Sequence, residues 1–494
     1  MKRASGILMP ISSLPGPWGI GTLGQQAYEF VDFLSRAGQT YWQILPIGPT
    51  GYGDSPYQSF SAFAANPYFI DPAQLVEQGL LTVQETQRPW GDDPQRVDYG
   101  ALYQHRHAML EQAVQRISPQ NQELAAYVQA NAHWLEDYAL FMALKEENGQ
   151  QSWQTWPQPV RMRQPQALEQ ARQRLAHRVH YWQCVQYLFA CQWQKLHAYA
   201  AAQGISIIGD IPIYVSPDSS DLWAHPELFQ TDGEGNVTHV AGCPPDAFAA
   251  DGQLWGNPLY KWEYHKATGY AWWVQRLRSA LAVYDVVRID HFRGFESYYS
   301  IPAGQTTAQN GSWQPGPGMD LMGVLHKELP QARIIAEDLG YLTPQVIQLL
   351  QDSGYPGMKV LQFAFDQREA GDYLPHNYQA HSVVYTGTHD NTTTAAWEQE
   401  ASPEDVRQAR EYTHCWPQEP LVDAFIRTAF ASVSNTAIVP MQDWLGLGSQ
   451  ARMNVPSRAQ GNWQWRMLPG KADEALAQRI EQLTRLYGRS PAGH

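Results

Sequence analysis

Four carboxylates stand at or just past the end of short apolar runs. Asp210, Asp290 and Glu337 belong to runs rich in Ile and Val, and Asp390 follows a fourth run by a few residues. Arg288 precedes Asp290 by two positions, and side chains two apart on a strand share a face, so we expect an Arg–Asp pair. Gathered carboxylates bind a divalent metal, perform two-carboxylate glycosyl chemistry or form structural ion pairs.

Aromatic residues in polar loops favour a sugar substrate among these uses. Trp, Tyr and Phe make up 12% of the chain, and many lie in Gly/Pro/Asp-rich stretches such as 52–57 and 255–258. An aromatic ring offers a flat apolar face beside hydrogen-bonding groups, which suits the C–H face of a sugar ring. A metal site stays an alternative, because His291 follows Asp290 and His389 precedes Asp390.

Eight β-type runs alternate with helix-like segments to position these residues. Continuous Val/Ile/Leu runs are typical of strands buried on both faces, as in parallel sheets. The pattern predicts a (β/α)₈ barrel, whose catalytic groups lie at the carboxyl ends of its strands. The runs span 6–11, 41–47, 205–215, 286–290, 333–337, 358–365, 382–387 and 436–441, and the clearest helices span 25–37, 271–283, 343–353 and 420–432.

Uneven spacing of the runs predicts insertions into the barrel. We expect residues 1–72 to hold the first two strands and a cleft loop, 73–180 to form an inserted helical subdomain, and 181–494 to complete the barrel. Cleft-covering loops are expected near 243–258 and 445–462. One apolar helical face near the end of the insertion is formed by Tyr181, Val185, Leu188, Phe189 and Leu196.

Charge and cysteine content exclude several classes of protein. The net charge is −14 without a Lys/Arg-rich run, which argues against nucleic acid as a partner. No apolar run approaches the ~18 residues of a transmembrane helix, and Pro10 and Pro15 interrupt the N-terminal run, so no membrane span or secretion signal is expected. Cys184 and Cys191 would lie ~10 Å apart on a helix, too far for a disulfide. We expect a cytoplasmic protein with reduced thiols.

Seven ordered motifs resemble one family of enzymes, from about residue 5 to about 468. The sequence is similar to glycoside hydrolase family 77, the amylomaltases or disproportionating enzymes, which are 4-α-glucanotransferases (EC 2.4.1.25). The motifs are DSPYQS at 54–59, GDIPIYV at 209–215, GCPPD at 242–246, GQLWGNP at 252–258, VRIDHFRGF at 287–295, AEDLG at 336–340 and GTHDN at 387–391.

The resemblance implies an α-amylase-type barrel and retaining transfer of α-1,4-glucan segments to glucose or another glucan. By motif, Asp290 would be the nucleophile, Glu337 the general acid/base and Asp390 the stabiliser of the transition state. Retention requires two carboxyl groups only ~5–5.5 Å apart, which adjacent strand ends can supply. The resemblance implies neither a cofactor nor a metal, and its partners would be α-1,4-glucans, maltooligosaccharides and glucose.

The resemblance also implies a set of substrate-binding residues. Tyr57 would stack on the donor sugar with Tyr52 nearby, and Asp210, Arg288 and His389 would contact the same sugar or orient the nucleophile. The loop near 243–258 would face the acceptor with Asp246, Gln253 and Trp255, and Asn454 would lie on the loop that closes the other side.

One stretch departs from the wider α-amylase group, and one acidic residue is given no catalytic role. Asp210 is followed by Ile-Pro-Ile-Tyr in place of the usual Asn-His pair, which argues against a calcium-dependent amylase. Asp338 should point away from Glu337, so we give it no catalytic role.

Three other functions are weighed against the transferase. A retaining glucan hydrolase shares the same carboxylates and is the close alternative. A glucan-binding protein without activity would lack the carboxylates, and a metal-dependent barrel enzyme acting on a small acid would lose activity in EDTA.

Overall fold

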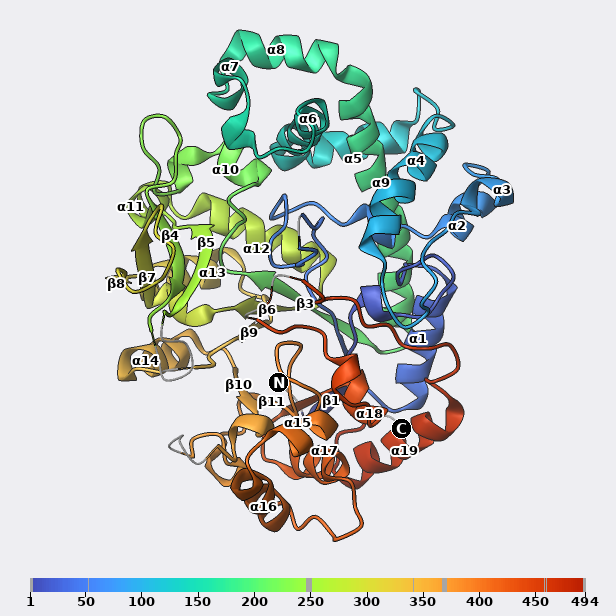
Figure 1. Cartoon of the computed structure of the whole chain (residues 1–494), viewed down its shortest axis with the longest axis vertical. Helices are drawn as coiled ribbons and strands as arrows, with labels where there is room; N and C mark the ends of the chain where they lie inside the picture. The colour runs from blue at the N-terminus through green and yellow to red at the C-terminus, as the bar shows by residue number, and fades with distance from the viewer. Residues whose placement is uncertain are drawn as a thin grey trace.

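A nearly closed barrel of eight parallel strands forms the centre of the protein (Figure 1). The computed structural model describes residues 3–51, 53–245, 251–340, 342–366, 371–456, 458 and 460–491. The strand order is β10-β11-β12-β1-β2-β3-β6-β9, and the seven neighbouring pairs are parallel. These strands are β1 (Ala4–Leu8), β2 (Tyr41–Gln43), β3 (Ser206–Pro212), β6 (Val286–Asp290), β9 (Ile334–Ala336), β10 (Gly357–Val360), β11 (Ser382–Tyr385) and β12 (Thr436–Pro440).

Each predicted run overlaps one barrel strand, as expected for Val/Ile-rich segments covered on both faces. Every residue of β1, β11 and β12 is buried, and β6 has the predicted bounds. Other strands are shorter than their runs. The run 41–47 ends as a strand at Gln43, before Pro46, which lacks the N–H needed for a ladder. The run 358–365 leaves the sheet at Val360 and continues as a 3₁₀ turn.

Helices pack around the barrel and extend from it. Thr343 caps α14 as predicted, because its Oγ1 accepts a hydrogen bond from Val346 N at 3.3 Å, with Pro344 at the first helical position. The helices are α1 (Gln25–Arg36), α2 (Pro72–Glu77), α3 (Val83–Thr86), α4 (Tyr99–Val114), α5 (Gln122–Ala130), α6 (Ala132–Glu147), α7 (Gln158–Arg161), α8 (Pro165–Arg174), α9 (Ala176–Ala202), α10 (Ser220–Ala224), α11 (Trp262–Ala267), α12 (Ala271–Val283), α13 (Gly318–Glu328), α14 (Pro344–Ser353), α15 (Thr394–Glu400), α16 (Pro403–Tyr412), α17 (Leu421–Ala431), α18 (Met441–Trp444) and α19 (Glu474–Leu486).

A second, antiparallel sheet includes much of the stretch near 243–258, and the cleft-covering role of that stretch stays a prediction. The sheet has the order β5-β4-β7-β8 and lies beside the barrel at the left of Figure 1. Its strands are β4 (His239–Cys243), β5 (Gln253–Pro258), β7 (Ser297–Pro302) and β8 (Ser312–Pro315). Gln253 and Trp255 therefore stand on β5. The sequence did not indicate this strand, because β5 begins with exposed residues and contains Gly256, a pattern typical of a turn.

The helices between β2 and β3 rise from one side of the barrel, at the top of Figure 1. The expected boundary at 180/181 falls inside α9, and the division into separate units stays a prediction. Burial on α9 is wider than the predicted face, because Cys184 and Trp193 are buried as well. Within the part of the chain that the structure describes, no helix is both long and apolar enough to cross a bilayer.

The two ends of the described chain are joined at the amino ends of the barrel strands. Ala4 pairs with Thr436 as β1 runs beside β12. Arg489, which is fully buried, donates from Nη1 to Ala4 O at 2.9 Å and from Nε to Phe430 O at 2.9 Å. Arg3 donates from Nε to Tyr487 O at 2.9 Å. This face lies opposite the carboxyl ends of the strands.

Candidate active site

The carboxyl ends of neighbouring strands bring the predicted acidic residues together. Asp290 is the last residue of β6, and Glu337 directly follows β9. The two strands are adjacent, with Ile289 opposite Ala336, and Glu337 N donates to Ile289 O at 3.0 Å. Asp390 lies in the loop after β11. Each side chain therefore stands at the barrel mouth.

Arg288 links two of the acidic residues, which confirms the predicted Arg–Asp pair. Its Nη1 donates to Asp210 Oδ2 at 2.6 Å, and its Nη2 lies 3.1 Å from Asp290 Oδ1. Its Nε donates to the sulfur of Met358 at 3.3 Å. Burial raises the pKa of Asp290, and the nearby Glu337 and Asp210 raise it further, while Arg288 opposes them. The guanidinium thus offsets part of the cost of burying negative charge.

Glu337 is held by the backbone on both sides and lacks a direct cation contact among its described partners. Its side chain accepts hydrogen bonds from His291 N at 2.7 Å and from Leu339 N at 2.8 Å. His291 adopts the left-handed conformation with φ 54°, which turns its N–H toward the carboxyl group. Burial raises the pKa of Glu337 in spite of Arg288 and the two N–H groups. A carboxyl group with a raised pKa keeps its proton at higher pH and can donate it.

A stacked aromatic wall lies beside Asp210. The Tyr57 ring stacks on His389 with centroids 5.1 Å apart and planes at 16°, and its hydroxyl donates to Asp210 Oδ2 at 2.8 Å. Trp463 lies 5.8 Å from the Tyr57 ring and 5.9 Å from His389. Burial lowers the pKa of His389, so its imidazole stays neutral.

Two buried glutamines of α9 hold the connection that carries Tyr57. Gln186 donates to Ala65 O and accepts from Ala65 N, each at 2.8 Å. Gln192 accepts from Asp71 N at 2.7 Å and donates to Asp71 O at 3.1 Å. The long connection after β2 is therefore fixed from the helical side.

The loop after β12 is hydrogen-bonded to Asp390. Asn454 Nδ2 donates to Asp390 Oδ1 at 2.6 Å, and Arg452 donates to the Asp390 carbonyl at 2.8 Å and to the Asn454 carbonyl at 2.7 Å. His389 Nε2 lies 3.4 Å from Asp390 Oδ2. The Asp390 side chain is 45% exposed, against 28% for Asp290, so it stays more accessible to a ligand.

Strand β5 brings Trp255 to the other side of the site. The Trp255 ring meets the His291 ring at 4.8 Å in an edge-on arrangement, and its Nε1 donates to Gln253 Oε1 at 3.1 Å. Burial lowers the pKa of His291 to about 3, so this imidazole is neutral. Two predicted binding residues, Tyr52 and Asp246, lie outside the described residues.

Sequence reasoning missed Trp463 and Arg452, and it named His291 only as a possible metal ligand. Trp463 follows Gly461 and Asn462 in a polar loop, which is the signal that singled out the other aromatic residues. His291 lies inside a recognised motif, but its role depends on a backbone conformation. Arg452 precedes Asn454 by two residues, and only the fold shows its contacts.

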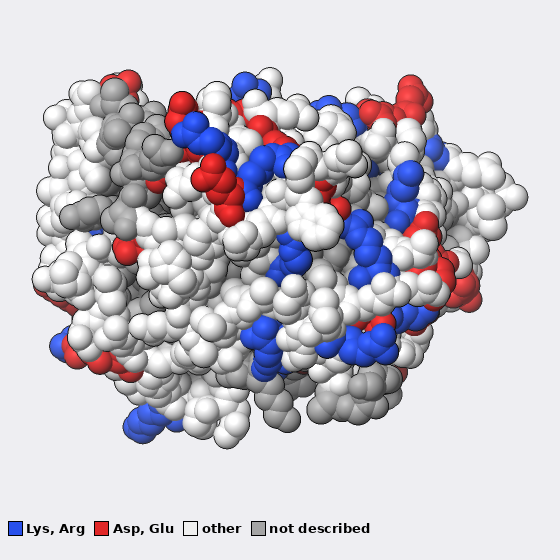
Figure 2. All heavy atoms as spheres, turned by 90° about the horizontal axis from the view of Figure 1, so that it is seen from below, with Lys and Arg blue, Asp and Glu red and all other residues white. Residues whose placement is uncertain are grey.

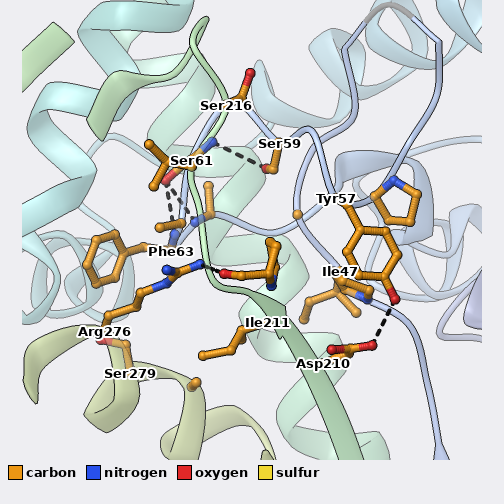
Figure 3. Close-up of a pocket in the computed structure, with 18 of the residues that line it drawn as sticks. Ile47, Tyr57, Ser59, Ser61, Phe63, Asp210, Ile211, Ser216, Arg276 and Ser279 are labelled. Carbon is orange, nitrogen blue, oxygen red and sulfur yellow. Dashed lines mark hydrogen bonds between the residues drawn. The ribbon is translucent and has the colours of Figure 1, made fainter. Parts of the chain in front are cut away.

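A small cavity lies behind the aromatic wall, lined by Asp210 but separate from the other three carboxylates. Figure 3 shows Tyr57 and Asp210 at one end of it and Arg276 at the other. Its volume is about 80 Å³, and its lining includes Ser59 and Ser61 but not Asp290, Glu337 or Asp390. Among the described residues, no group of three or more His, Cys, Asp or Glu is placed to hold a metal ion.

The barrel, the acidic mouth and the aromatic wall define a carbohydrate-active enzyme of the (β/α)₈ class. The family model described as 4-alpha-glucanotransferase matches residues 9–471. The chain therefore belongs to glycoside hydrolase family 77, the 4-alpha-glucanotransferases, which are glycosyl-transferring enzymes.

Individual relatives agree with this family along nearly the whole chain. A 4-alpha-glucanotransferase of Streptococcus pneumoniae is 50% identical and covers 99% of this chain and 98% of its own. One from Thermus thermophilus is 48% identical and covers 98% of both chains. The solved structure of the amylomaltase from Streptococcus agalactiae in complex with acarbose is 42% identical, with a TM-score of 0.96 over 99% of this chain and 100% of that one.

Proposed function

We propose that this enzyme transfers α-1,4-glucan segments by a retaining mechanism through a glycosyl ester on Asp290. The donor is a maltooligosaccharide or a starch-type glucan, and the acceptor is the 4-hydroxyl of glucose or of another glucan. The observation that carries the proposal is the pair of Asp290 and Glu337 at adjacent strand ends, with Arg288 on Asp290 alone. A relative solved with acarbose supports an oligosaccharide in this cleft.

In the first step, Asp290 attacks the anomeric carbon of the donor. One carboxylate oxygen forms a bond to that carbon while the bond to the glycosidic oxygen breaks. Glu337 delivers its proton to the departing oxygen, so the reducing-end piece leaves as an alcohol. Because Arg288 contacts Asp290 and not Glu337, we assign the negative charge of the pair to Asp290 and the proton to Glu337.

In the second step, Glu337 acts as a base. It takes the proton from the acceptor 4-hydroxyl, whose oxygen attacks the anomeric carbon and releases the Asp290 carboxylate. Two inversions give net retention. Asp390 stabilises the positive charge of the oxocarbenium-like transition state, and Asn454 holds its carboxylate in place at 2.6 Å.

Tyr57 and His389 of the aromatic wall, together with the neighbouring Asp210, bind the donor sugar next to the scissile bond. The Tyr57 ring supplies an apolar face, while the polar atoms of its neighbours bind hydroxyl groups. Tyr52 adds to this side. Gln253 and Trp255 on β5, with Asp246, form the acceptor side. Arg288 orients Asp290 through the contact of its Nη2 with Asp290 Oδ1.

Neutral glucan is a better match to the surface than a polyanion. On the face seen in Figure 2, some Lys and Arg side chains lie beside Asp and Glu side chains and others lie singly among broad uncharged areas. The net charge of −14 opposes nucleic acid binding. We also propose a cytoplasmic location, since Cys184, Cys191 and Cys415 are free thiols.

Transfer should exceed hydrolysis because the acceptor side holds a sugar hydroxyl near the intermediate. An acceptor that makes several directed contacts gains a high effective concentration, which water does not. Closing the cleft around the reactive ester also excludes bulk water.

Incubation with maltotriose alone is the decisive experiment. A transferase yields a ladder of shorter and longer oligomers with no net gain in reducing ends. A hydrolase yields glucose and maltose with a steady rise in reducing ends, and that result would refute the proposal. Repeating the assay in EDTA tests the metal-dependent alternative, because loss of activity there would require a metal.

A further inference from the structure

The strand pairing of the barrel leaves its two end strands unpaired with each other. A carboxylate that is not one of the three proposed catalytic groups joins them. The ladder ends at β9 on one side and at β10 on the other. Asp338, two residues beyond β9, accepts a hydrogen bond from Met358 N of β10 at 2.6 Å. Ala336 N donates to Pro356 O at 3.0 Å. A side chain thus takes the place that a backbone carbonyl takes in an ordinary ladder.

The space between β9 and β10 fits this carboxylate closely. Asp338 is only 3% exposed. A Cβ at Gly357 would come within 2.5 Å of Asp338 Oδ2 and 2.8 Å of its Cγ. Since real side chains do not approach so closely, only glycine at 357 leaves room for the Asp338 carboxylate. The short strand β10 is therefore docked through this group.

From Met358, the contacts lead to the proposed nucleophile. The backbone of Met358 is held by Asp338, and its sulfur accepts a hydrogen bond from Arg288 Nε at 3.3 Å. Arg288 then contacts Asp290 at 3.1 Å. Displacement of Met358 would remove the partner of one guanidinium nitrogen in a buried site, which is costly.

In the other direction, the contacts lead to the proposed acid/base. Asp338 lies between Glu337 and Leu339, and Leu339 N donates to Glu337 Oε1 at 2.8 Å. Anchoring Asp338 on β10 fixes the turn that aims this N–H. The two carboxyl groups point to different partners, as strand alternation predicted.

We propose that Asp338 is a positioning residue that fixes Glu337 and Arg288 together by joining β9 to β10. It does not touch the substrate. The inference rests on the proposed acid/base role of Glu337.

The charges around Glu337 determine whether its pKa rises or falls when the Asp338 charge is removed. Burial raises the pKa of Glu337 and Asp338 raises it too, while Arg288 on β6 lowers it. Burial raises the pKa of Asp290, also on β6, and Glu337 raises it further, while His291 is neutral. Burial raises the pKa of Asp338 itself, and Lys359 on β10 lowers it. Removing the Asp338 charge should lower the pKa of Glu337, so the acid form is lost at a lower pH.

The test compares Asp338→Asn with Asp338→Ala across pH. Asparagine keeps an oxygen for Met358 N but loses the charge. We expect its alkaline limb of kcat to move down by about 0.5 pH unit or more, with KM for maltotriose unchanged within about 2-fold. Alanine breaks the join as well, so kcat should fall a further ~10-fold or more. Wild-type kcat together with a wild-type alkaline limb in Asp338→Ala would overturn the proposal.

Asp443→Asn is the matched control. Asp443 is another buried carboxylate, which accepts a hydrogen bond from Thr394 N at 2.8 Å, but it lies outside the proposed machinery. Its substitution should lower the melting temperature without moving the alkaline limb. An equal shift in this control would also overturn the proposal. Full activity of Glu337→Gln would instead refute the proposed acid/base, so the two failures are distinguishable.

Discussion

The indole of Trp255 meets the imidazole of His291 edge-on, with ring centroids 4.8 Å apart and planes at 88°. The N–H of the same His291 donates to Glu337 at 2.7 Å. A residue of the antiparallel sheet therefore packs on the residue that orients the proposed acid/base. This contact joins the proposed acceptor side to the proposed acid/base through a single side chain.

Trp255→Ala should lower transfer by about 10-fold or more while hydrolysis changes much less, because the acceptor loses its contact surface and water does not depend on it. The assay follows reducing ends and chain-length redistribution in the same sample. Gln253→Ala should act in the same direction. Trp313→Ala is the control, since Trp313 is a 41%-exposed residue of β8 in the same sheet. An unchanged ratio in both test variants would place acceptor selection elsewhere.

Asp290→Asn should abolish transfer and leave glucan binding largely intact. The amide cannot form the ester, and the loss of a covalent nucleophile costs many orders of magnitude in rate. Binding is measured by calorimetry with a long maltooligosaccharide, and rates are measured on freshly prepared protein so that deamidation does not restore the acid. Substantial residual transfer by such a preparation would remove Asp290 from its role.

Glu337→Gln should separate the two halves of the reaction. A donor with a good leaving group needs little protonation, so Asp290 should still be glycosylated, but the ester should accumulate without a base. Intact-mass analysis detects the adduct. In the wild type, burial raises the pKa of Glu337, so activity should persist above the ordinary range of a glutamic acid and fall at higher pH. Wild-type turnover by Glu337→Gln with a poor leaving group would contradict the assignment.

Local sequence patterns predicted the barrel and the positions of the carboxylates, because apolar runs that end in polar residues indicate the carboxyl ends of buried parallel strands. They did not predict β5, which begins with exposed residues and ends with buried ones, or β8, which is exposed throughout, because neither shows apolar alternation. The wall partner Trp463 depends on a contact between segments about four hundred residues apart. Likewise, Asp338 has a partner on another strand, and no spacing along the chain indicates it.

Asp54→Asn should stabilise the protein increasingly as pH rises from 4 to 6. Asp54 has φ 59°, which asparagine tolerates, and burial raises its pKa to about 6. A raised pKa means that stability present below about pH 4 is lost as pH rises through the folded-state value. With its partial exposure taken into account, the gain at pH 7 should be about 1 kcal/mol.

Melting temperatures of Asp54→Asn and the wild type at pH 4, 5, 6 and 7 measure this gain. Asp232→Asn is the opposite case, because hydrogen bonds from Asn236 lower the pKa of the exposed Asp232. Its substitution should give no such gain. A constant difference between Asp54→Asn and the wild type at all four pH values would show that Asp54 does not titrate as described.

The pairing of β1 with β12 and the hydrogen bond from Arg489 to Ala4 O determine where the protein can be immobilised or circularly permuted. Residues 4 and 489 meet at the amino ends of the strands, and the cleft opens at their carboxyl ends. A short linker between them could therefore close the chain into a ring, and new ends could be opened in an exposed turn of the helical region. A tag or solid support fixed near either residue would leave the cleft facing away from the support, free to receive long glucans.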